Sequence, residues 1–199
     1  MLAVTGYNSA IVRQLAALIP EEQVQRIDHA SYRNCLHADR YVLCAGVMVP
    51  TPGIEQHRVQ VFTSMRVNYL EPMSICDAVF QVNPRARICV VGSESGFSGS
   101  YDHIYAAAKS ALHRYVETKR LQPQQQLVAV APTIIEDAGM TLRRRDPEVL
   151  DRKRQAHPKR RFLTAVEVAR LIHFLLYVDD GYISGVTVRM NGGAHTVAS

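Results

Sequence analysis

The chain has 199 residues, of which 47% are hydrophobic and 21% charged, the composition of one ordinary globular domain. A domain of this size folds without disulfides, and its four cysteines show no C-x-x-C spacing. The longest apolar runs have the length of a strand, well short of the roughly 20 residues of a transmembrane helix. No secretory signal is visible at the N-terminus. We therefore expect a single cytoplasmic domain over residues 1–199, with reduced thiols, no metal site and no membrane partner.

The net charge of +5 is concentrated in one segment. Residues 143–161 contain nine Lys and Arg against three Asp and Glu, so the rest of the chain is close to neutral. A local basic patch on a neutral body indicates a narrower partner than the nucleic acid that a wholly basic chain would favour. The segment also lacks interleaved aromatic side chains that stack on bases, and we expect no nucleic-acid partner.

Short apolar strands alternate with helical segments from end to end. In chain order, strands are predicted at residues 2–5, 23–27, 41–44, 88–91, 127–131 and 183–190, and helices at 10–18, 58–80, 101–121 and 165–178. The last helix opens with a capping box formed by Thr164 and Glu167. Because the strands are almost continuously apolar, the sheet should be parallel and covered on both faces. The sequence predicts an α/β fold, a Rossmann-like doubly wound parallel sheet of about six strands.

Pro72 lies inside the predicted 58–80 helix, four residues after Asn68. Proline has no amide hydrogen and its ring crowds the carbonyl four residues earlier, so we expect a kink that leaves the Asn68 carbonyl free. The alternative is a helix that begins after residue 71, with Pro72 in its first turn, where proline is tolerated.

Small or hydroxylated residues follow four of the predicted strands. In an open parallel sheet, ligands bind outside the carboxyl ends of the strands, and small residues there let a ligand approach the backbone closely. The sequence therefore predicts a binding site at this edge of the sheet, built from residues 5–10, 45–46, 92–96 and 132–133.

Tyr105 and Lys109 form the most specific pair in the sequence, because an i, i+4 spacing places both on one face of a helix. A phenol with a pKa of about 10 is a weak acid and base at neutral pH, and a neighbouring cation lowers that pKa. Alone, such a pair is usually a solvated contact on a surface helix. Ser93 follows a predicted strand twelve residues upstream, and its placement favours a catalytic interpretation.

With these residues included, the sequence resembles the short-chain dehydrogenase/reductase family over nearly its whole length. The similarity rests on an ordered set of short motifs, each of them weak alone. They are T-G-x-x-x-G-x-G at 5–12, N-N-A-G at 43–46, the helix asparagine Asn68, the catalytic serine Ser93, Y-x-x-x-K at Tyr105 and Lys109, P-G-x-V/I at 132–135, E-V-A at 167–169, Gly185, and G-G at 192–193.

The resemblance implies an NAD(P)-dependent oxidoreductase that interconverts an alcohol and a carbonyl on a small-molecule substrate. Tyr105 would give or take the proton at the substrate oxygen, and Lys109 would lower the pKa of Tyr105 and hold the nicotinamide ribose. Ser93 would hydrogen-bond the substrate oxygen, and Asn68 would anchor a water of the proton relay. The implied cofactor-binding residues are Gly6, Asn8, Ala10, Ile11, Asp28, Ala45, Gly46, Tyr105, Lys109, Pro132 and Ile135.

The family also implies an assembly. Its members commonly pair the helices that correspond to 58–80 and 101–121 across a two-fold axis, and both carry apolar residues beyond one core-facing stripe. We therefore expect a homodimer or homotetramer.

Several family positions differ here, mainly in the part that binds the cofactor. Ala10 and Val12 replace two of the three glycines of the first motif, and valine should push the helix outward. Cys44 replaces an asparagine, and the carboxylate of Asp137 would repel the pyrophosphate unless it turns away. A non-catalytic dinucleotide-binding redox sensor on the same fold is therefore the alternative function. The retained serine, tyrosine, lysine and helix asparagine favour the enzyme.

Only twelve residues separate Asp28 from the strand at Tyr41, too few for helix, strand and helix, so the family's third strand should be absent. Asp28 then either holds the adenosine ribose, or takes over the third strand's contact with adenine, or is a solvated loop residue. An aspartate at the ribose favours NAD. NADP stays open, because Arg26, Arg33 and His29 lie near enough in the sequence to hold a 2′-phosphate.

Residues 139–161 fall where the family places its substrate-covering loop, and Asp146-Pro147 and Pro158 are predicted as the start and stop of a helix. The basic residues of this lid either meet an anionic substrate or carrier, or form the solvated face of a mobile loop. The histidines form no rival site. His113 and His173 lie on predicted helices, where we expect packed or interface residues.

Overall fold

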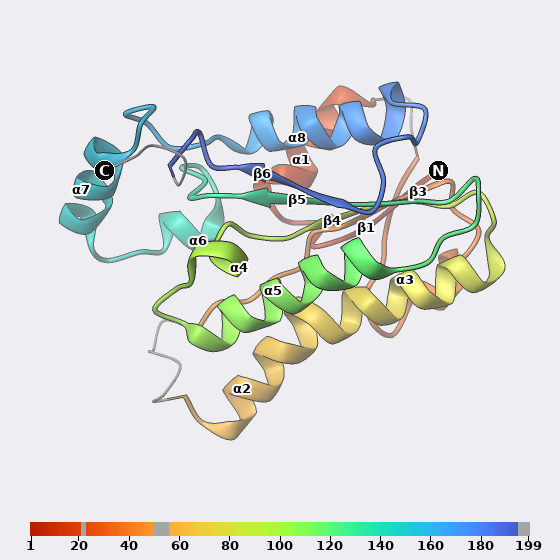
Figure 1. The fold of residues 1–199 in the computed structure, drawn as a ribbon, viewed down its shortest axis with the longest axis horizontal. Coiled ribbons are helices and arrows are strands. Elements are labelled where there is room, and N and C mark those ends of the chain that lie inside the picture. Colours follow the sequence, from red (N-terminus) through yellow and green to blue (C-terminus); the bar gives the residue numbers. More distant parts are fainter. Residues whose placement is uncertain (21–22, 50–55, 195–199) are drawn as a thin grey trace.

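The computed structural model describes residues 1–20, 23–49 and 56–194 (Figure 1). Six strands form one all-parallel sheet in the order β2-β1-β3-β4-β5-β6, which confirms the predicted Rossmann-like α/β fold. β6 begins three residues later than predicted, because Gly185 takes a φ of 67° and the Ile183 amide donates to Asp179 in a turn. The strands are β1 (Leu2–Thr5), β2 (Val24–Arg26), β3 (Arg40–Leu43), β4 (Arg87–Val91), β5 (Gln126–Pro132) and β6 (Val186–Met190).

The short connection between β2 and β3 contains no strand, as the spacing predicts. All its residues are described, and they form only a 3₁₀ helix, Tyr32–Cys35. β2 is therefore an edge strand of three residues, and two of them, Gln25 and Arg26, are exposed. This edge borders the predicted cofactor site.

Helices cover both faces of the sheet (Figure 1). α1 (Ala10–Leu18) and α8 (Ala165–His173) pack with the side chains of Leu2 and Val4 in one apolar core. α3 (Glu71–Val82) and α5 (His103–Thr118) pack on the opposite face, in a second core that includes Ala3. Alternate residues of each strand thus enter separate cores, as expected for a doubly wound sheet. The capping box predicted at Thr164 and Glu167 begins α8.

The helix around Pro72 departs from the expected kink. α2 (Arg58–Met65) is followed by one π turn, Arg66–Leu70, and then directly by α3, so the chain stays helical across the proline. In the π turn the Glu71 amide donates to the Arg66 carbonyl, five residues back instead of four. The irregularity therefore precedes Pro72, which is the second residue of α3, and it contains Asn68.

Three further helices follow the carboxyl ends of β4 and β5: α4 (Ser95–Ser98), α6 (Gly139–Leu142) and α7 (Pro147–Ala156). Figure 1 shows α6 and α7 beyond this edge of the sheet. Asp146 caps α7 and Pro147 is its first residue, as predicted. A second π turn, Phe174–Val178, extends α8. Within the described ranges, no helix is both long and apolar enough to cross a membrane.

Candidate active site

The turn after β1 brings two strand ends into direct contact. Gly6 has a φ of 65°, and a Cβ there would lie 2.8 Å from the Ala45 nitrogen and from the Cys44 carbonyl. Thr5 reinforces the contact, because its Oγ1 accepts a 3.1 Å hydrogen bond from the Ala45 amide. Only glycine fits this conformation and this close approach, so the first glycine of the motif has a physical reason to be present.

The first turn of α1 offers amides to a ligand. Ser9 caps the helix, and its Oγ accepts a 3.1 Å hydrogen bond from the Val12 amide. The amides of Ala10 and Ile11 have no acceptor within the helix, which is the usual arrangement of an anion site at a helix N-terminus. The side chain of Val12 is fully buried in the core shared with α8, so the position of the missing glycine is filled by packing.

Asp137 does turn away from the expected phosphate position. Its Oδ1 accepts a 2.8 Å hydrogen bond from the amide of Ala165, the first residue of α8. The carboxylate is therefore held at a different helix N-terminus, where the helix dipole favours negative charge.

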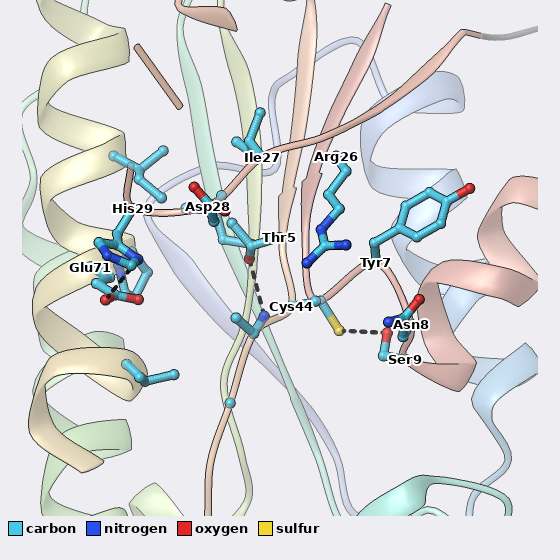
Figure 2. Close-up of a pocket in the computed structure, with 17 residues that line it drawn as sticks. Thr5, Tyr7, Asn8, Ser9, Arg26, Ile27, Asp28, His29, Cys44 and Glu71 are labelled. Atoms are coloured by element: carbon cyan, nitrogen blue, oxygen red, sulfur yellow. Dashed lines mark hydrogen bonds and ion pairs between the residues drawn. The ribbon is translucent and has the colours of Figure 1, made fainter. Parts of the chain in front are cut away.

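A cavity of about 310 Å³ opens beside the β1–α1 turn and the end of β3 (Figure 2). It is lined by five of the predicted cofactor-binding residues: Gly6, Asn8, Asp28, Ala45 and Gly46.

The other six predicted cofactor residues lie outside this cavity lining, and two of them, Tyr105 and Lys109, belong to the catalytic patch described below. Ala10 and Ile11 are buried in the first turn of α1, where only their amides are relevant. The carbonyl of Pro132 accepts from the Glu94 amide, and Ile135 belongs to the apolar core.

Asp28 is held in a rigid turn at the open edge of the cavity. Its Oδ1 accepts hydrogen bonds from the amides of Ala30 and Ser31 and from the Ser31 hydroxyl, at 2.8–2.9 Å. These bonds lower the pKa of the carboxyl, the Ser31 hydroxyl contributing most. Figure 2 shows the Arg26 guanidinium extending into the same space, between Asp28 and Tyr7.

His29 and Arg33, the other two basic residues considered for a 2′-phosphate, differ in position. His29 lines the cavity, with its Nδ1 3.7 Å from Glu71 Oε1, and Glu71 also pairs with Arg66 at 2.8 Å. Arg33 lies on the 3₁₀ helix over the Tyr32 ring and does not line the cavity.

The predicted catalytic residues gather on one buried patch. Tyr105 and Lys109 are 5% and 3% exposed, and the Lys109 Nζ lies 5.8 Å from the centre of the Tyr105 ring. The Ser93 side chain accepts a 3.2 Å hydrogen bond from the Ser95 amide and lies near enough to Tyr105 to lower the pKa of its hydroxyl. Gly46 connects this patch to the cavity, because a Cβ there would lie 3.3 Å from Asn68 Oδ1 and 3.9 Å from Lys109 Nζ.

Burial controls the protonation of this patch. It raises the pKa of Tyr105 to about 12, and the neighbouring Ser93 side chain acts in the opposite direction. It lowers the pKa of Lys109 to about 8, and the ammonium donates a 2.7 Å hydrogen bond to the Val91 carbonyl. The direction for Tyr105 is the reverse of the expected one, because removal of the phenolate from water dominates and the nearby Asp102 carboxylate acts in the same direction.

Asn68 holds the loop after β3. Its Nδ2 donates to the Val47 carbonyl at 2.7 Å and to the Ser64 carbonyl at 2.9 Å, and its Oδ1 accepts from the Val47 amide at 3.1 Å. The side chain is completely buried. The π turn thus directs an amide group at the backbone beside Gly46.

Two groups at the site were missed by the sequence analysis. Asp102 is completely buried, and its carboxylate accepts from the Tyr105 amide and the Val49 amide, both at 3.0 Å. An aspartate three residues before Tyr105 is a helix-cap signal, but the predicted helix began at residue 101, two residues too early to reveal it. Glu94, buried beside Ser93, forms an ion pair with Arg189 of β6, a contact that only the tertiary fold creates.

Comparison with known proteins agrees with this architecture. A family model described as enoyl-(acyl carrier protein) reductase matches residues 19–195. The chain belongs to the short-chain dehydrogenase/reductase family. It is 26% identical to 2,3-dihydroxy-2,3-dihydro-p-cumate dehydrogenase of Pseudomonas putida over 94% of this chain and 76% of the relative. It is 33% identical to 3-oxoacyl-[acyl-carrier-protein] reductase FabG of Aquifex aeolicus over 54% of this chain and 44% of the relative.

Solved structures of short-chain dehydrogenase/reductases share the fold. A Brucella melitensis member aligns over 98% of this chain and 96% of its own, with 20% identity and a TM-score of 0.83. The aldohexose dehydrogenase of Thermoplasma acidophilum aligns over 99% and 94%, with 16% identity and a TM-score of 0.85.

Members of this family generally use NAD or NADP, and the residues present fit such a dinucleotide. Gly6 lines the cavity and lets the β1–α1 turn lie against the Cys44–Ala45 backbone, α1 presents its first amides, and the cavity lies at the carboxyl ends of β1 and β3. The replaced glycines do not block this cavity, since neither Ala10 nor Val12 is among its lining residues.

Proposed function

We propose that this short-chain dehydrogenase/reductase is an NAD(P)-dependent enzyme that interconverts an alcohol and a carbonyl on a small anionic substrate, with Tyr105 as the general acid and base. The observation that supports this most is that the buried Tyr105 and Lys109 lie together with the half-buried Ser93 beside the cavity at Gly46. A merely structural tyrosine–lysine pair would have no reason to adjoin a nucleotide-sized cavity.

At the cavity, backbone groups and one carboxylate hold the cofactor, which supplies or accepts a hydride when bound. The amides of Ala10 and Ile11 bind its phosphates, and Gly6 allows the close approach. The Lys109 ammonium, with one donor on the Val91 carbonyl, keeps donors for the nicotinamide ribose.

At the catalytic patch, the Tyr105 hydroxyl gives its proton to the carbonyl oxygen in reduction and takes it back in oxidation. Ser93 holds the same oxygen by a hydrogen bond. A Tyr105 pKa of about 12 keeps the phenol protonated at neutral pH, which suits reduction, and oxidation should accelerate as pH rises. Asn68 keeps its proposed role as an anchor of the proton-relay water.

We propose NAD as the preferred cofactor. Asp28 lines the cavity and its Oδ1 already accepts three hydrogen bonds, so the second carboxylate oxygen is the acceptor proposed for the adenosine ribose. A 2′-phosphate beside this low-pKa carboxylate would be repelled. Arg26 in the same cavity is the observation that favours NADP.

The segment 139–161 is proposed as a lid over the substrate. Its α6 contributes Met140, whose Cε would lie 3.6 Å from a Cβ at Gly46, so the lid reaches the catalytic patch. Three of its nine basic residues form ion pairs: Arg144, Arg154 and Arg161. The exposed Arg143 and Arg145 have no ion pair within the described ranges and are the candidates to attract an anionic substrate or carrier.

We also propose a homodimer or homotetramer that pairs α2 and α3 with α5. Val59 and Phe62 of α2 are 75% and 62% exposed, an apolar pair that a partner helix would cover. Sedimentation velocity at micromolar concentration should find a species larger than the 22.3 kDa chain, and a pure monomer would contradict the assembly.

The decisive test of the activity is Tyr105→Phe, measured with a panel of small carbonyl compounds and alcohols. Loss of the acid and base should lower kcat by about 10²–10⁴-fold while the cofactor still raises the melting temperature. Tyr182→Phe, the same change at a tyrosine that is 97% exposed, is the matched control and should be silent. Wild-type protein that binds the cofactor without turning over any of the panel would support the redox-sensor alternative instead.

A further inference from the structure

One buried histidine lies directly behind the candidate catalytic serine. His113 is on α5, two turns after Tyr105, and is 3% exposed. Its Nε2 accepts a 3.3 Å hydrogen bond from the backbone amide of Ser93. The proposed chemistry of Ser93, Tyr105 and Lys109 does not use this ring.

The ring fits a slot that the loop after β4 builds for it. A Cβ on Gly92 would lie 2.2 Å from the ring, and a Cβ on Gly96 would lie 2.6 Å from it, so glycine is needed at both places. Phe97 stacks on the open face of the ring, with centroids 4.7 Å apart and planes 22° apart. The Arg189 guanidinium covers Phe97 in turn, 4.5 Å from its centroid. The loop that carries Ser93 is therefore wrapped around this one side chain.

The histidine is not explained by stability alone. Because Nε2 accepts a hydrogen bond, the neutral ring carries its proton on Nδ1. That nitrogen is buried, and no acceptor for it is found in the described part of the chain. A buried donor without a partner destabilises the fold, and such a group in a native structure calls for a functional reason.

We propose that His113 is a positioning residue that fixes the Ser93 backbone, and through it the Ser93 hydroxyl, against Tyr105. This inference rests on the proposed activity and adds a residue to that site. The contact needs a free lone pair on Nε2, so only the neutral ring can make it.

The surroundings keep the ring neutral. Burial lowers the pKa of His113 to about 4, and Lys109 on the same helix and Arg189 from β6 act in the same direction. Glu94, from the loop after β4, opposes them. With this balance of charges, the ring remains an acceptor throughout the neutral range.

The test compares His113→Leu, which removes the acceptor, with His113→Gln, whose Oε1 can take the place of Nε2. We expect His113→Leu to lower kcat by about 10–100-fold, a typical cost of a displaced catalytic group, with little change in melting temperature or in the melting shift induced by the cofactor. His113→Gln should restore most of the rate. His173→Leu, at a histidine stacked on Tyr177 away from the site, is the matched control and should leave kcat unchanged.

A double-mutant cycle separates positioning from general packing. If His113 acts through Ser93, adding His113→Leu to Ser93→Ala should lower kcat no further than Ser93→Ala alone. The inference would be overturned if the double variant lowered kcat by the product of the two single effects, or if His113→Leu had the kcat of the wild type. Absence of turnover in the wild type would overturn the proposed function itself, so the two failures are distinguishable.

Discussion

At the β1–α1 end of the cavity, backbone atoms supply most of the proposed binding groups, whereas at the α5 end the candidate groups are side chains, buried in Tyr105 and Lys109 and half-buried in Ser93. Three of the departures from the family pattern, Ala10, Val12 and Cys44, fall at the first end. An amide binds phosphate whatever side chain follows it, so substitutions there are tolerated if the backbone keeps its course. At the second end Ser93, Tyr105 and Lys109 are retained, because the proposed chemistry depends on the side chains themselves.

This contrast predicts that small side-chain changes will matter most around α5. Asp102→Asn keeps the size of the side chain but replaces one acceptor oxygen by an NH₂ group, which would face either the Tyr105 amide or the Val49 amide. One buried backbone N–H then loses its partner. We expect kcat to fall by about 10²-fold because either Tyr105 or the loop beside Gly46 loses support.

Steady-state kinetics and thermal melting check this expectation. Asp39→Asn, at a mostly exposed aspartate that pairs with the N-terminal amine, is the control and should leave kcat unchanged. An Asp102→Asn enzyme with wild-type kcat would mean that the α5 end is less dependent on its side chains than the structure indicates.

The fold was predictable because its signals are local. Apolar runs identified all six strands, and the twelve residues between Asp28 and Tyr41 predicted the missing strand. The π turn at Asn68 was not predicted, because Pro72 favours a kink, with a helix that begins after residue 71 as the alternative, and neither includes a widened turn. Whether a π turn forms depends on how the whole helix packs on the sheet.

The candidate site was predictable only in part, because only some of its residues are determined by local sequence signals. Ser93, Tyr105 and Lys109 are recognisable from spacing, since a strand end and one helix face determine their placement. Asp102 could be recognised only from the exact start of α5, because it is the N-cap of that helix. His113 was correctly expected to be packed, but its bond to the Ser93 amide joins residues 20 positions apart on two elements. Tertiary contacts of this kind leave no periodic trace in the sequence.

The cofactor end can be tested at its one side chain with a charge-specific role. Asp28→Asn should weaken NAD binding by about tenfold, because a neutral amide makes weaker hydrogen bonds to ribose hydroxyls than a carboxylate does. NADP binding should change little or improve, since a repulsive charge is removed. Melting shifts with each cofactor over a concentration series measure both effects.

Arg26→Gln is the matched variant, because Arg26 lines the same cavity with the opposite charge. It should leave the NAD shift unchanged and weaken NADP. A wild-type protein that prefers NADP, together with a loss of that preference in Arg26→Gln, would reverse the proposed cofactor choice.

The smallest expected effect concerns the lid, residues 139–161, which belongs to neither of the two compared regions. Arg143 and Arg145 are exposed, whereas Arg144 is held in an ion pair by Asp146. If the first two attract an anionic substrate, changing both to Gln should raise KM by about three- to tenfold and leave kcat nearly unchanged, because they act before the chemical step. Added salt should raise the wild-type KM as well, since exposed charges are screened within about 10 Å at 0.1 M ionic strength.

The double variant should lose that salt dependence, and Arg152→Gln with Lys153→Gln on α7 serves as a control of equal charge. A KM that responds to neither salt nor the Arg143 and Arg145 changes would make the basic segment a solvated surface, and substrate selection would then depend on the buried α5 end alone.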